Sequence, residues 1–190
     1  DANLVVNEYT EYDCYDTLLD FNQDGTDVVP ALAESWEQVD DLTYTYKIRE
    51  GVKFSDGSDL TMDDVLYSLN RVREDAYGMS YLFEHVDSFE VDEKTRTLTV
   101  HLTQPDSTWK YVPATTPCQI LKKSVVEAEG DAYGTNEGSV VGTGPYKFVS
   151  RSLQENVVLK KFDAYWGEPA HIEDVALNVK VYTFLSSDTV

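Results

Sequence analysis

Adjacent acidic residues are the side chains of this 190-residue sequence that could most directly do chemistry. Three such pairs are Asp40–Asp41, Asp63–Asp64 and Glu173–Asp174. Two neighbouring carboxyl groups can act as a general acid and a general base, as in a secreted hydrolase. Solvated surface acids explain the same pairs, and Asp63–Asp64 also suits the first turn of a helix, where negative charge is favourable. No catalytic residue is therefore assigned, and a hydrolase is kept as an alternative.

The metal-binding signals in the sequence are incomplete. Asp20–Gly25 fits the first half of an EF-hand calcium loop, with oxygen ligands at alternate positions and glycine at the sixth. The twelfth position of such a loop needs a bidentate Glu, but here it is Ala31, directly after Pro30. The three histidines, which lie far apart, are His85, His101 and His171. We expect a polar turn at Asp20–Gly25, and neither a metal nor a cofactor.

A glycine-rich segment, Gly142–Tyr146 (GTGPY), has some likeness to a phosphate-binding loop. It lacks the Gly-Lys-Ser/Thr that completes such a loop, and it precedes a predicted strand instead of opening a helix. Two glycines and a proline predict a sharp turn at this point.

The charge and composition of the chain limit its partners. A net charge of −20 disfavours binding to nucleic acid or to an anionic membrane surface. The apolar fraction of 42%, with 13 Tyr, is that of a globular domain. No run reaches the roughly 20 apolar residues of a membrane-spanning helix. The two cysteines, Cys14 and Cys118, are too few for a disulfide framework, and we expect free thiols.

One strand and one helix stand out in the hydrophobic pattern. Apolar and polar residues alternate over Leu42–Ile48, which predicts a half-buried strand with Leu42 on its inner face. Apolar residues then recur at helical spacing from Met62 to Arg73. Thr61, three residues before Asp64, is a variant of the capping box that starts a helix. We expect Asp63 and Asp64 on the exposed side of this helix.

The remaining pattern is dominated by short strands. The other predicted strands are Leu4–Val6, Phe89–Val91, Arg96–Leu102, Tyr146–Val149, Val157–Leu159 and one within Ile172–Val181. The predicted short helices are Cys14–Phe21, Tyr81–Glu84 and Ile120–Glu129. This mixture predicts an α/β fold of mixed α+β type, with mixed sheets and short helices.

Three ordered segments resemble one protein family. They are Ala31–Trp36 (ALAESW) leading through the Tyr/Thr strand to Ile48–Val72 (IREGVKFSDGSDLTMDDVLYSLNRV), then Gly142–Tyr146 (GTGPY), then Asp163–Gly167 (DAYWG). Together they are similar to the family 5 extracellular solute-binding proteins of ABC importers, which bind oligopeptides, dipeptides or nickel. The resemblance covers roughly two thirds of the chain, and three matches in order are more specific than any one of them.

The resemblance implies a type II periplasmic-binding-protein-like fold, in which two lobes close on a ligand. This chain would be most of the first lobe, and the second lobe would lie outside it. Residues 1–28 and 141–190 would form the cleft-facing core, and residues 29–140 an inserted subdomain. The resemblance also implies export to the periplasm or cell surface, usually with a lipid anchor on a Cys upstream of Asp1.

The resemblance places the ligand contacts outside its own motifs, which serve as scaffold. The expected contacts follow the first strand, lie in the loop near Tyr81 and lie in one later segment; they are Glu8, Tyr9, Thr10, Tyr81, Thr115, Thr116 and Cys118. A peptide is the expected solute, and an ABC permease the expected partner. An oligosaccharide stays open because the chain is rich in Tyr. A nickel chelate is disfavoured, because no Arg or Lys precedes Lys122 in the later segment. A structural surface domain is the remaining alternative.

Overall fold

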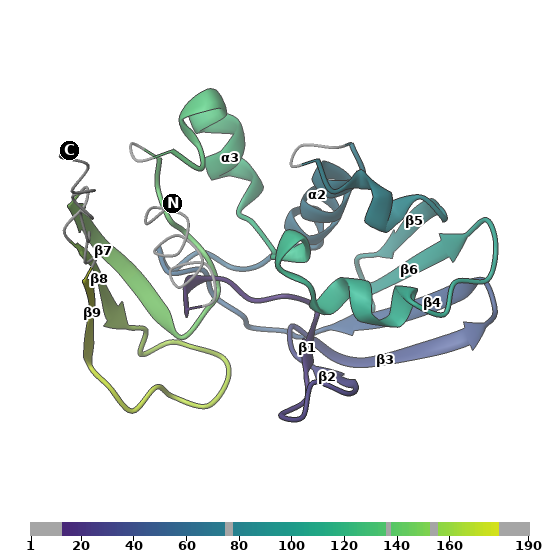
Figure 1. The fold of residues 1–190 in the computed structure, drawn as a ribbon, viewed down its shortest axis with the longest axis horizontal. Coiled ribbons are helices and arrows are strands. Elements are labelled where there is room, and N and C mark those ends of the chain that lie inside the picture. Colours follow the sequence, from purple (N-terminus) through teal and green to yellow (C-terminus); the bar gives the residue numbers. More distant parts are fainter. Residues whose placement is uncertain (1–12, 75–77, 136–137, 153–155, 179–190) are drawn as a thin grey trace, which may run out of the picture.

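The computed structural model describes residues 13–74, 78–135, 138–152 and 156–178. Two antiparallel sheets lie at opposite ends of the molecule in Figure 1, with most of the helical segments beside the larger one. This arrangement confirms the predicted mixture of short strands and short helices. The predicted strand Leu4–Val6 and the residues Glu8, Tyr9 and Thr10 lie outside the described residues.

The larger sheet has four strands in the order β3 (Ala33–Asp40), β4 (Thr43–Ile48), β6 (Thr97–Leu102), β5 (Val86–Asp92). The alternation predicted for β4 and β6 is confirmed, since alternate residues of both strands are buried on one face. Tyr44 pairs with Val100 and Tyr46 with Leu98, so these inward side chains form cross-strand contacts. Leu42 was wrongly placed on the inner face: it precedes β4 in the turn from β3 and is 38% exposed.

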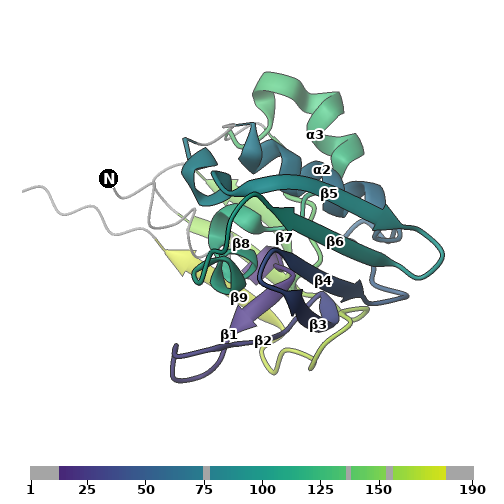
Figure 2. The same cartoon turned by 90° about the vertical axis from the view of Figure 1, so that its right-hand side faces the viewer.

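The helix α2 (Met62–Arg73) covers the inner face of the four-stranded sheet, as Figure 2 shows from the end of the molecule. Its apolar stripe, which includes Met62, Val65 and Leu69, joins the inward strand residues in one large hydrophobic core. Three short 3₁₀ segments close the edges of this core: η1 (Ser80–Phe83), η2 (Trp109–Ala114) and η3 (Thr116–Cys118). The predicted helical turn near Tyr81 is therefore confirmed as η1.

The start of α2 confirms the predicted capping box but corrects the placement of Asp64. The Thr61 hydroxyl accepts a hydrogen bond from Asp64 N (3.1 Å), and the Asp64 carboxylate accepts one from Thr61 N (3.0 Å). Asp64 is nevertheless buried, because its other carboxylate oxygen accepts a hydrogen bond from the backbone N of Lys123 (2.9 Å). Asp63 lies on the exposed side as expected and forms an ion pair with the Lys123 side chain.

Replacing Asp64 by alanine is expected to lower the free energy of unfolding by about 2 kcal/mol, because both the helix cap and the Lys123 backbone lose a partner. Asp63→Ala is the matched control, since it removes only an exposed ion pair and should change stability by less than about 1 kcal/mol. Urea unfolding of both variants measures the difference. Equal losses would show that the second carboxylate contact of Asp64 contributes nothing.

The N-terminal part of the described chain departs from the predicted helix Cys14–Phe21. Leu19–Phe21 is a strand, β1, which pairs with β2 (Val28–Pro30). The loop between them confirms the predicted polar turn, because the Asn22 side chain accepts hydrogen bonds from Thr26 N (2.8 Å) and Asp27 N (3.2 Å). The side-chain oxygen of Asn22 thus accepts hydrogen bonds from the loop backbone and closes the turn.

The smaller sheet is built from the end of the described chain, in the order β7 (Tyr146–Ser152), β8 (Asn156–Lys161), β9 (Asp174–Asn178). These strands confirm the three predicted late in the sequence, although the part of the last prediction beyond Asn178 lies outside the described residues. Val157 and Leu159 of β8 form a second, small hydrophobic cluster with Cys14. This cluster makes residue 14 a link between the first described residues and the smaller sheet.

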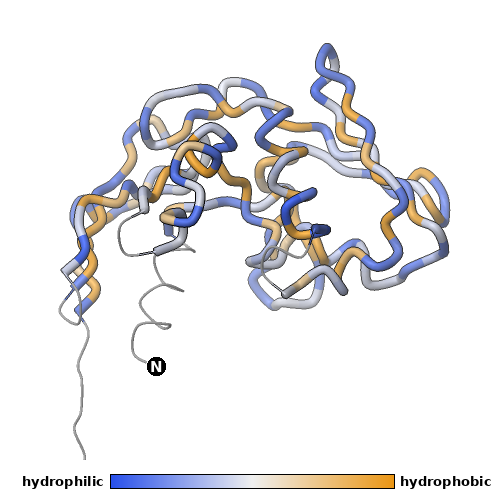
Figure 3. Tube along the Cα trace, turned by 90° about the horizontal axis from the view of Figure 1, so that it is seen from above, coloured by the Kyte–Doolittle hydropathy of each residue, from blue (hydrophilic) through white to orange (hydrophobic). Residues whose placement is uncertain are grey.

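A last pair of helical segments, α3 (Lys123–Glu129) and η4 (Gly130–Ala132), lies in the chain between η3 and the β7–β9 sheet. The predicted helix Ile120–Glu129 is correct only from Lys123; Ile120 and Leu121 are buried but lie outside the helix. Along the trace in Figure 3, hydrophobic and hydrophilic stretches alternate over short distances. Within the described ranges, no helix is both long and apolar enough to span a bilayer.

Candidate functional site

The expected ligand contacts that the structure describes lie on two short elements that both pack against α2. Tyr81 belongs to η1 and is 63% exposed, so its ring faces solvent. Thr115 and Thr116 lie where η2 meets η3 and are half-buried. These three side chains remain predicted contacts, and each is accessible to a solute.

Cys118 is the exception among these predicted contacts. Its side chain is fully buried in the main core, and that burial raises the pKa of the thiol to about 12. The thiol therefore stays protonated and cannot reach a solute without opening the core. Cys118 N donates a hydrogen bond to Thr115 O (2.9 Å), and the Thr115 hydroxyl lies 3.7 Å from its sulfur. Cys118 therefore supports the Thr115–Cys118 segment by packing its side chain in the core and by its backbone hydrogen bond to Thr115.

The hydroxyl of Thr115 is held in place by its own turn. Its Oγ1 donates a hydrogen bond to the backbone oxygen of Val112 (2.7 Å). A hydroxyl has one proton and two acceptor lone pairs, so this group can still accept a hydrogen bond from a donor on a solute.

A half-buried carboxylate that sequence reasoning missed, Asp16, lies where the GTGPY and DAYWG motifs meet. Oδ2 accepts hydrogen bonds from Thr143 Oγ1 (2.9 Å) and Trp166 Nε1 (2.8 Å), and Oδ1 accepts one from Tyr165 OH (3.4 Å). Burial raises the pKa of Asp16, and the hydrogen bonds from Trp166, Thr143 and Tyr165 oppose that rise. The only sequence signal for this cluster is that its donors come from the GTGPY and DAYWG motifs.

The two glycines of GTGPY allow the chain to approach the Asp16 segment closely. A Cβ on Gly142 would lie 2.1 Å from the backbone oxygen of Cys14, and one on Gly144 would lie 2.6 Å from its carbonyl carbon. Gly144 N also donates a hydrogen bond to Cys14 O (3.0 Å). Neither glycine has a positive φ, so close packing, and not left-handed backbone, is what requires glycine here.

Polar contacts hold the segment just before α3 against α2 and against the turn that contains Asp56. Ser68 Oγ accepts a hydrogen bond from Leu121 N (2.9 Å), and Lys122 forms an ion pair with Asp56. Partial burial by itself would raise the pKa of Asp56, but hydrogen bonds from Lys122 and Ser58 lower it to about 2. These contacts fix the position of the chain that leaves the Thr115–Cys118 segment.

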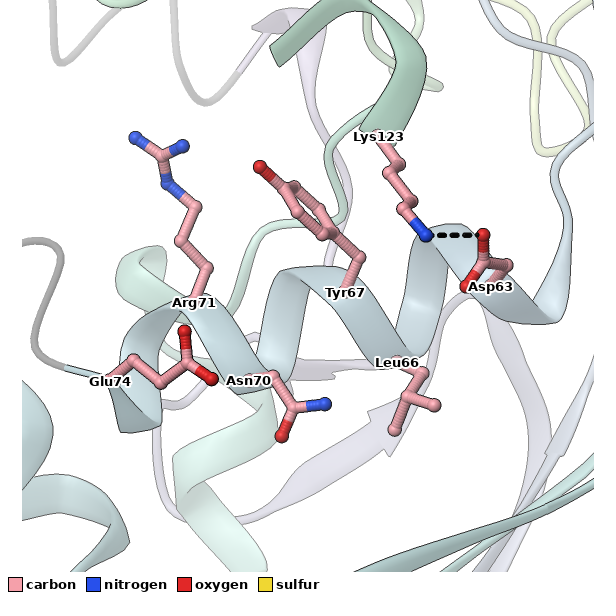
Figure 4. A pocket seen from close by; sticks show the side chains of 7 residues that line it. All are labelled: Asp63, Leu66, Tyr67, Asn70, Arg71, Glu74 and Lys123. Atoms are coloured by element: carbon pink, nitrogen blue, oxygen red, sulfur yellow. Dashed lines mark hydrogen bonds and ion pairs between the residues drawn. The ribbon is translucent and has the colours of Figure 1, made fainter. Parts of the chain in front are cut away.

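An open groove of about 460 Å³ lies on the outer side of α2, next to the start of α3. Figure 4 shows its lining side chains: Asp63, Leu66, Tyr67, Asn70, Arg71, Glu74 and Lys123. Lys123 is paired with Asp63 (2.8 Å) inside this groove, and Arg71 lies over the ring of Tyr133. Asp63, Lys123 and Arg71 are thus already engaged with groups of the protein itself.

The described residues contain no grouping of three His, Cys, Asp or Glu side chains suited to hold a metal ion. The acidic pairs of the sequence also have structural partners: Asp63 and Asp64 bind α3, Asp40 accepts a hydrogen bond from Leu42 N (2.8 Å), and Glu173 pairs with Lys161. At least one member of each acidic pair thus has a structural partner.

The chain is similar to solute-binding proteins in sequence and in structure. It is 30% identical to the dipeptide-binding protein of Escherichia coli K12, covering 87% of this chain and 35% of that protein. It is 29% identical to the HTH-type transcriptional regulator SgrR of E. coli O6:K15:H31, covering 85% of this chain and 27% of the regulator. Among solved structures, it resembles the periplasmic binding protein AgaA of A. tumefaciens R10 in complex with agropinic acid, with a TM-score of 0.79 and 25% identity.

The structural likeness to AgaA covers 90% of this chain and 34% of AgaA, so the chain spans about a third of the length of these relatives. The likeness confirms the predicted periplasmic-binding-protein-like fold. A family model, bacterial extracellular solute-binding proteins, family 5 (middle), matches residues 27–181. The chain therefore belongs to the family 5 bacterial extracellular solute-binding proteins.

Proposed function

We propose that this chain is part of the substrate-binding component of an ABC importer, which captures peptides outside the cytoplasm and delivers them to a membrane permease. The family match over residues 27–181 carries this proposal. The likeness to a dipeptide-binding protein over 87% of the chain favours a peptide as the solute. The hydroxyl of the half-buried Thr115 donates to Val112 O and keeps acceptor lone pairs for a peptide N–H.

The proposed mechanism is capture without covalent chemistry. A second lobe, supplied by sequence outside this chain, closes over the solute and excludes water from the cleft. The proposed contacts on this side are Glu8, Tyr9, Thr10, Tyr81, Thr115 and Thr116, with Cys118 supporting them from the core. Residues 29–140 act as an inserted subdomain, and residues 1–28 with 141–190 face the cleft. A periplasmic or cell-surface location, with a lipid anchor upstream of Asp1, completes the proposal.

A second candidate is a solute-sensing part of a transcriptional regulator, which the likeness to SgrR favours. Capture of a solute is common to both candidates, but the location of the protein and the partner that reads the closed form differ. The strongly acidic chain is not expected to contact DNA itself in either case. Cell fractionation separates the two: an envelope protein supports the importer, and a cytoplasmic protein supports the sensor.

Native mass spectrometry of the complete natural polypeptide, purified gently from its own cells, tests the proposal. We expect a spread of bound masses that differ by amino-acid residues and disappear when the protein is unfolded and refolded without solute. A bound opine, sugar or metal chelate would support solute capture but contradict the proposal that the solute is a peptide. A ligand at about 100 times its Kd adds about 2.7 kcal/mol to the free energy of unfolding. Peptide capture would therefore be contradicted if the protein carried no bound mass and a mixture of di- to pentapeptides also failed to stabilise it.

A further inference from the structure

Asp16 contacts three parts of the fold, two through its side chain and one through its backbone. Its carboxylate accepts hydrogen bonds from Thr143 and from Trp166, at 2.9 and 2.8 Å. Its backbone oxygen accepts a hydrogen bond from Ile120 N (2.9 Å), two residues after Cys118. A single residue thus contacts the loop before β7, the loop after β8 and the chain that leaves η3.

The chemistry of these contacts requires a good acceptor at position 16. The indole N–H of Trp166 can only donate, so its partner must accept. On its other side, the Trp166 ring lies under the guanidinium of Arg49, 4.8 Å from the ring centre, and Arg49 Nε donates to Ala31 O (2.7 Å). The Asp16 carboxylate therefore holds the N–H edge of the Trp166 indole, and Arg49, itself hydrogen-bonded to Ala31, covers the ring face.

Asp16 also lies between the two hydrophobic clusters of the protein. Cys14 belongs to the small cluster under the β7–β9 sheet, whereas Leu18 belongs to the main core. The backbone oxygens of this short segment bond to both sides, since Cys14 O accepts from Gly144 N (3.0 Å) and Thr17 O accepts from Leu32 N (3.1 Å). Figure 1 shows the two sheets at opposite ends, with this segment crossing between them.

We propose that Asp16 is a positioning residue that fixes the Thr115–Cys118 segment relative to the β7–β9 sheet and thereby sets the affinity of the solute site. The affinity part rests on the proposed function; the positioning part does not. The predicted contacts Thr115 and Thr116 are reached from Asp16 through the Ile120 hydrogen bond. The β7–β9 sheet is reached through Thr143 and Trp166, and β9 is the last described element of the chain.

The competing explanation is that Asp16 only adds stability, as any satisfied buried polar group does. Tyr46→Phe is a matched control for that explanation. It removes the hydroxyl that accepts the Nε1 hydrogen of Trp109 (3.1 Å), and so also leaves a buried indole without its acceptor. Tyr46 and Trp109 both lie in the main core, and the hydrogen bond that joins them involves neither Asp16 nor the Thr143 and Trp166 side chains.

The test compares Asp16→Ala, Asp16→Asn and Tyr46→Phe in the complete natural polypeptide by hydrogen–deuterium exchange. Each variant is measured at the same number of degrees below its own unfolding temperature. We expect the peptides that contain Ile120 and Gly144 to exchange about tenfold faster in Asp16→Ala than in Tyr46→Phe. The reason is that the hydrogen bonds from Ile120 N to Asp16 O and from Gly144 N to Cys14 O both loosen. Asp16→Asn keeps one carbonyl acceptor for Trp166 and Thr143, and should restore most of the protection. Equal exchange in Asp16→Ala and Tyr46→Phe would overturn the proposal.

Calorimetric titration with trialanine tests the consequence for affinity. We expect Asp16→Ala to raise the Kd at least about tenfold while Tyr46→Phe leaves it within about twofold, since only the first disturbs the geometry of the site. The same Kd in both variants would overturn the effect on affinity. A wild-type protein that binds no trialanine would count against the proposed peptide function, and the exchange experiment would still decide the role of Asp16.

Discussion

Replacing Trp109 by alanine is expected to lower the free energy of unfolding by about 3–5 kcal/mol, the loss typical of a buried tryptophan. Trp109 is 1% exposed, packs edge-on against the ring of Phe83 at 5.4 Å and donates its indole hydrogen to Tyr46 OH. The substitution therefore opens a large cavity and removes a buried hydrogen bond in the same place. Urea unfolding followed by circular dichroism measures the loss.

An exposed aromatic residue supplies the control for the tryptophan. Tyr81 is 63% exposed, so Tyr81→Ala should change the free energy of unfolding by less than about 0.5 kcal/mol. Trp109→Phe keeps much of the ring volume and should fall between the two. A loss below about 1 kcal/mol for Trp109→Ala would contradict the packing described for η2, because large-to-small core changes exceed that value.

Replacing Gly142 by alanine should be nearly as damaging, although it adds only one methyl group. The new Cβ would lie 2.1 Å from Cys14 O and 2.9 Å from Cys14 C, which are backbone atoms and cannot rotate away. The segment that carries Asp16 must then move, and we expect a loss of about 3 kcal/mol or more. Thermal and urea unfolding of the variant measure it.

Gly51→Ala separates this clash from the general effect of removing a glycine. Gly51 has a φ of +71° but no atom within 4 Å of an added Cβ. Its substitution brings only left-handed backbone strain, about 1 kcal/mol. If Gly142→Ala lost no more than Gly51→Ala, the close approach of the two chain segments would be wrong.

The elements that sequence reasoning predicted well are those whose stability is local. The strand β4 alternates buried and half-buried residues, and α2 begins at a capping box that lies within four residues of sequence. The strand β3 was missed for the opposite reason: Ala33 is its only fully buried residue, so an edge strand of this kind carries no alternation. Leu19–Phe21 was wrongly predicted as helical because a short apolar run fits either structure.

The polar sites depend on partners that are far apart in sequence. Asp64 was expected on the exposed side, but its second partner, Lys123 N, lies 59 residues away. Asp16 was overlooked because Thr143 and Trp166 lie 127 and 150 residues from it. Nothing next to these acids distinguishes them from the many solvated ones in so acidic a chain. The predicted contacts Tyr81, Thr115 and Thr116 came from the family resemblance alone, and they stay predictions.

The burial of both cysteines, Cys14 and Cys118, has a practical consequence for labelling this part of the protein. Both thiols have a pKa raised to about 12, by burial in each case and at Cys14 also by the neighbouring Asp13. Maleimides react with the thiolate, so neither native cysteine competes well for a dye at neutral pH. A single cysteine placed at an exposed position such as Val149 can then carry a fluorophore in the otherwise unaltered protein.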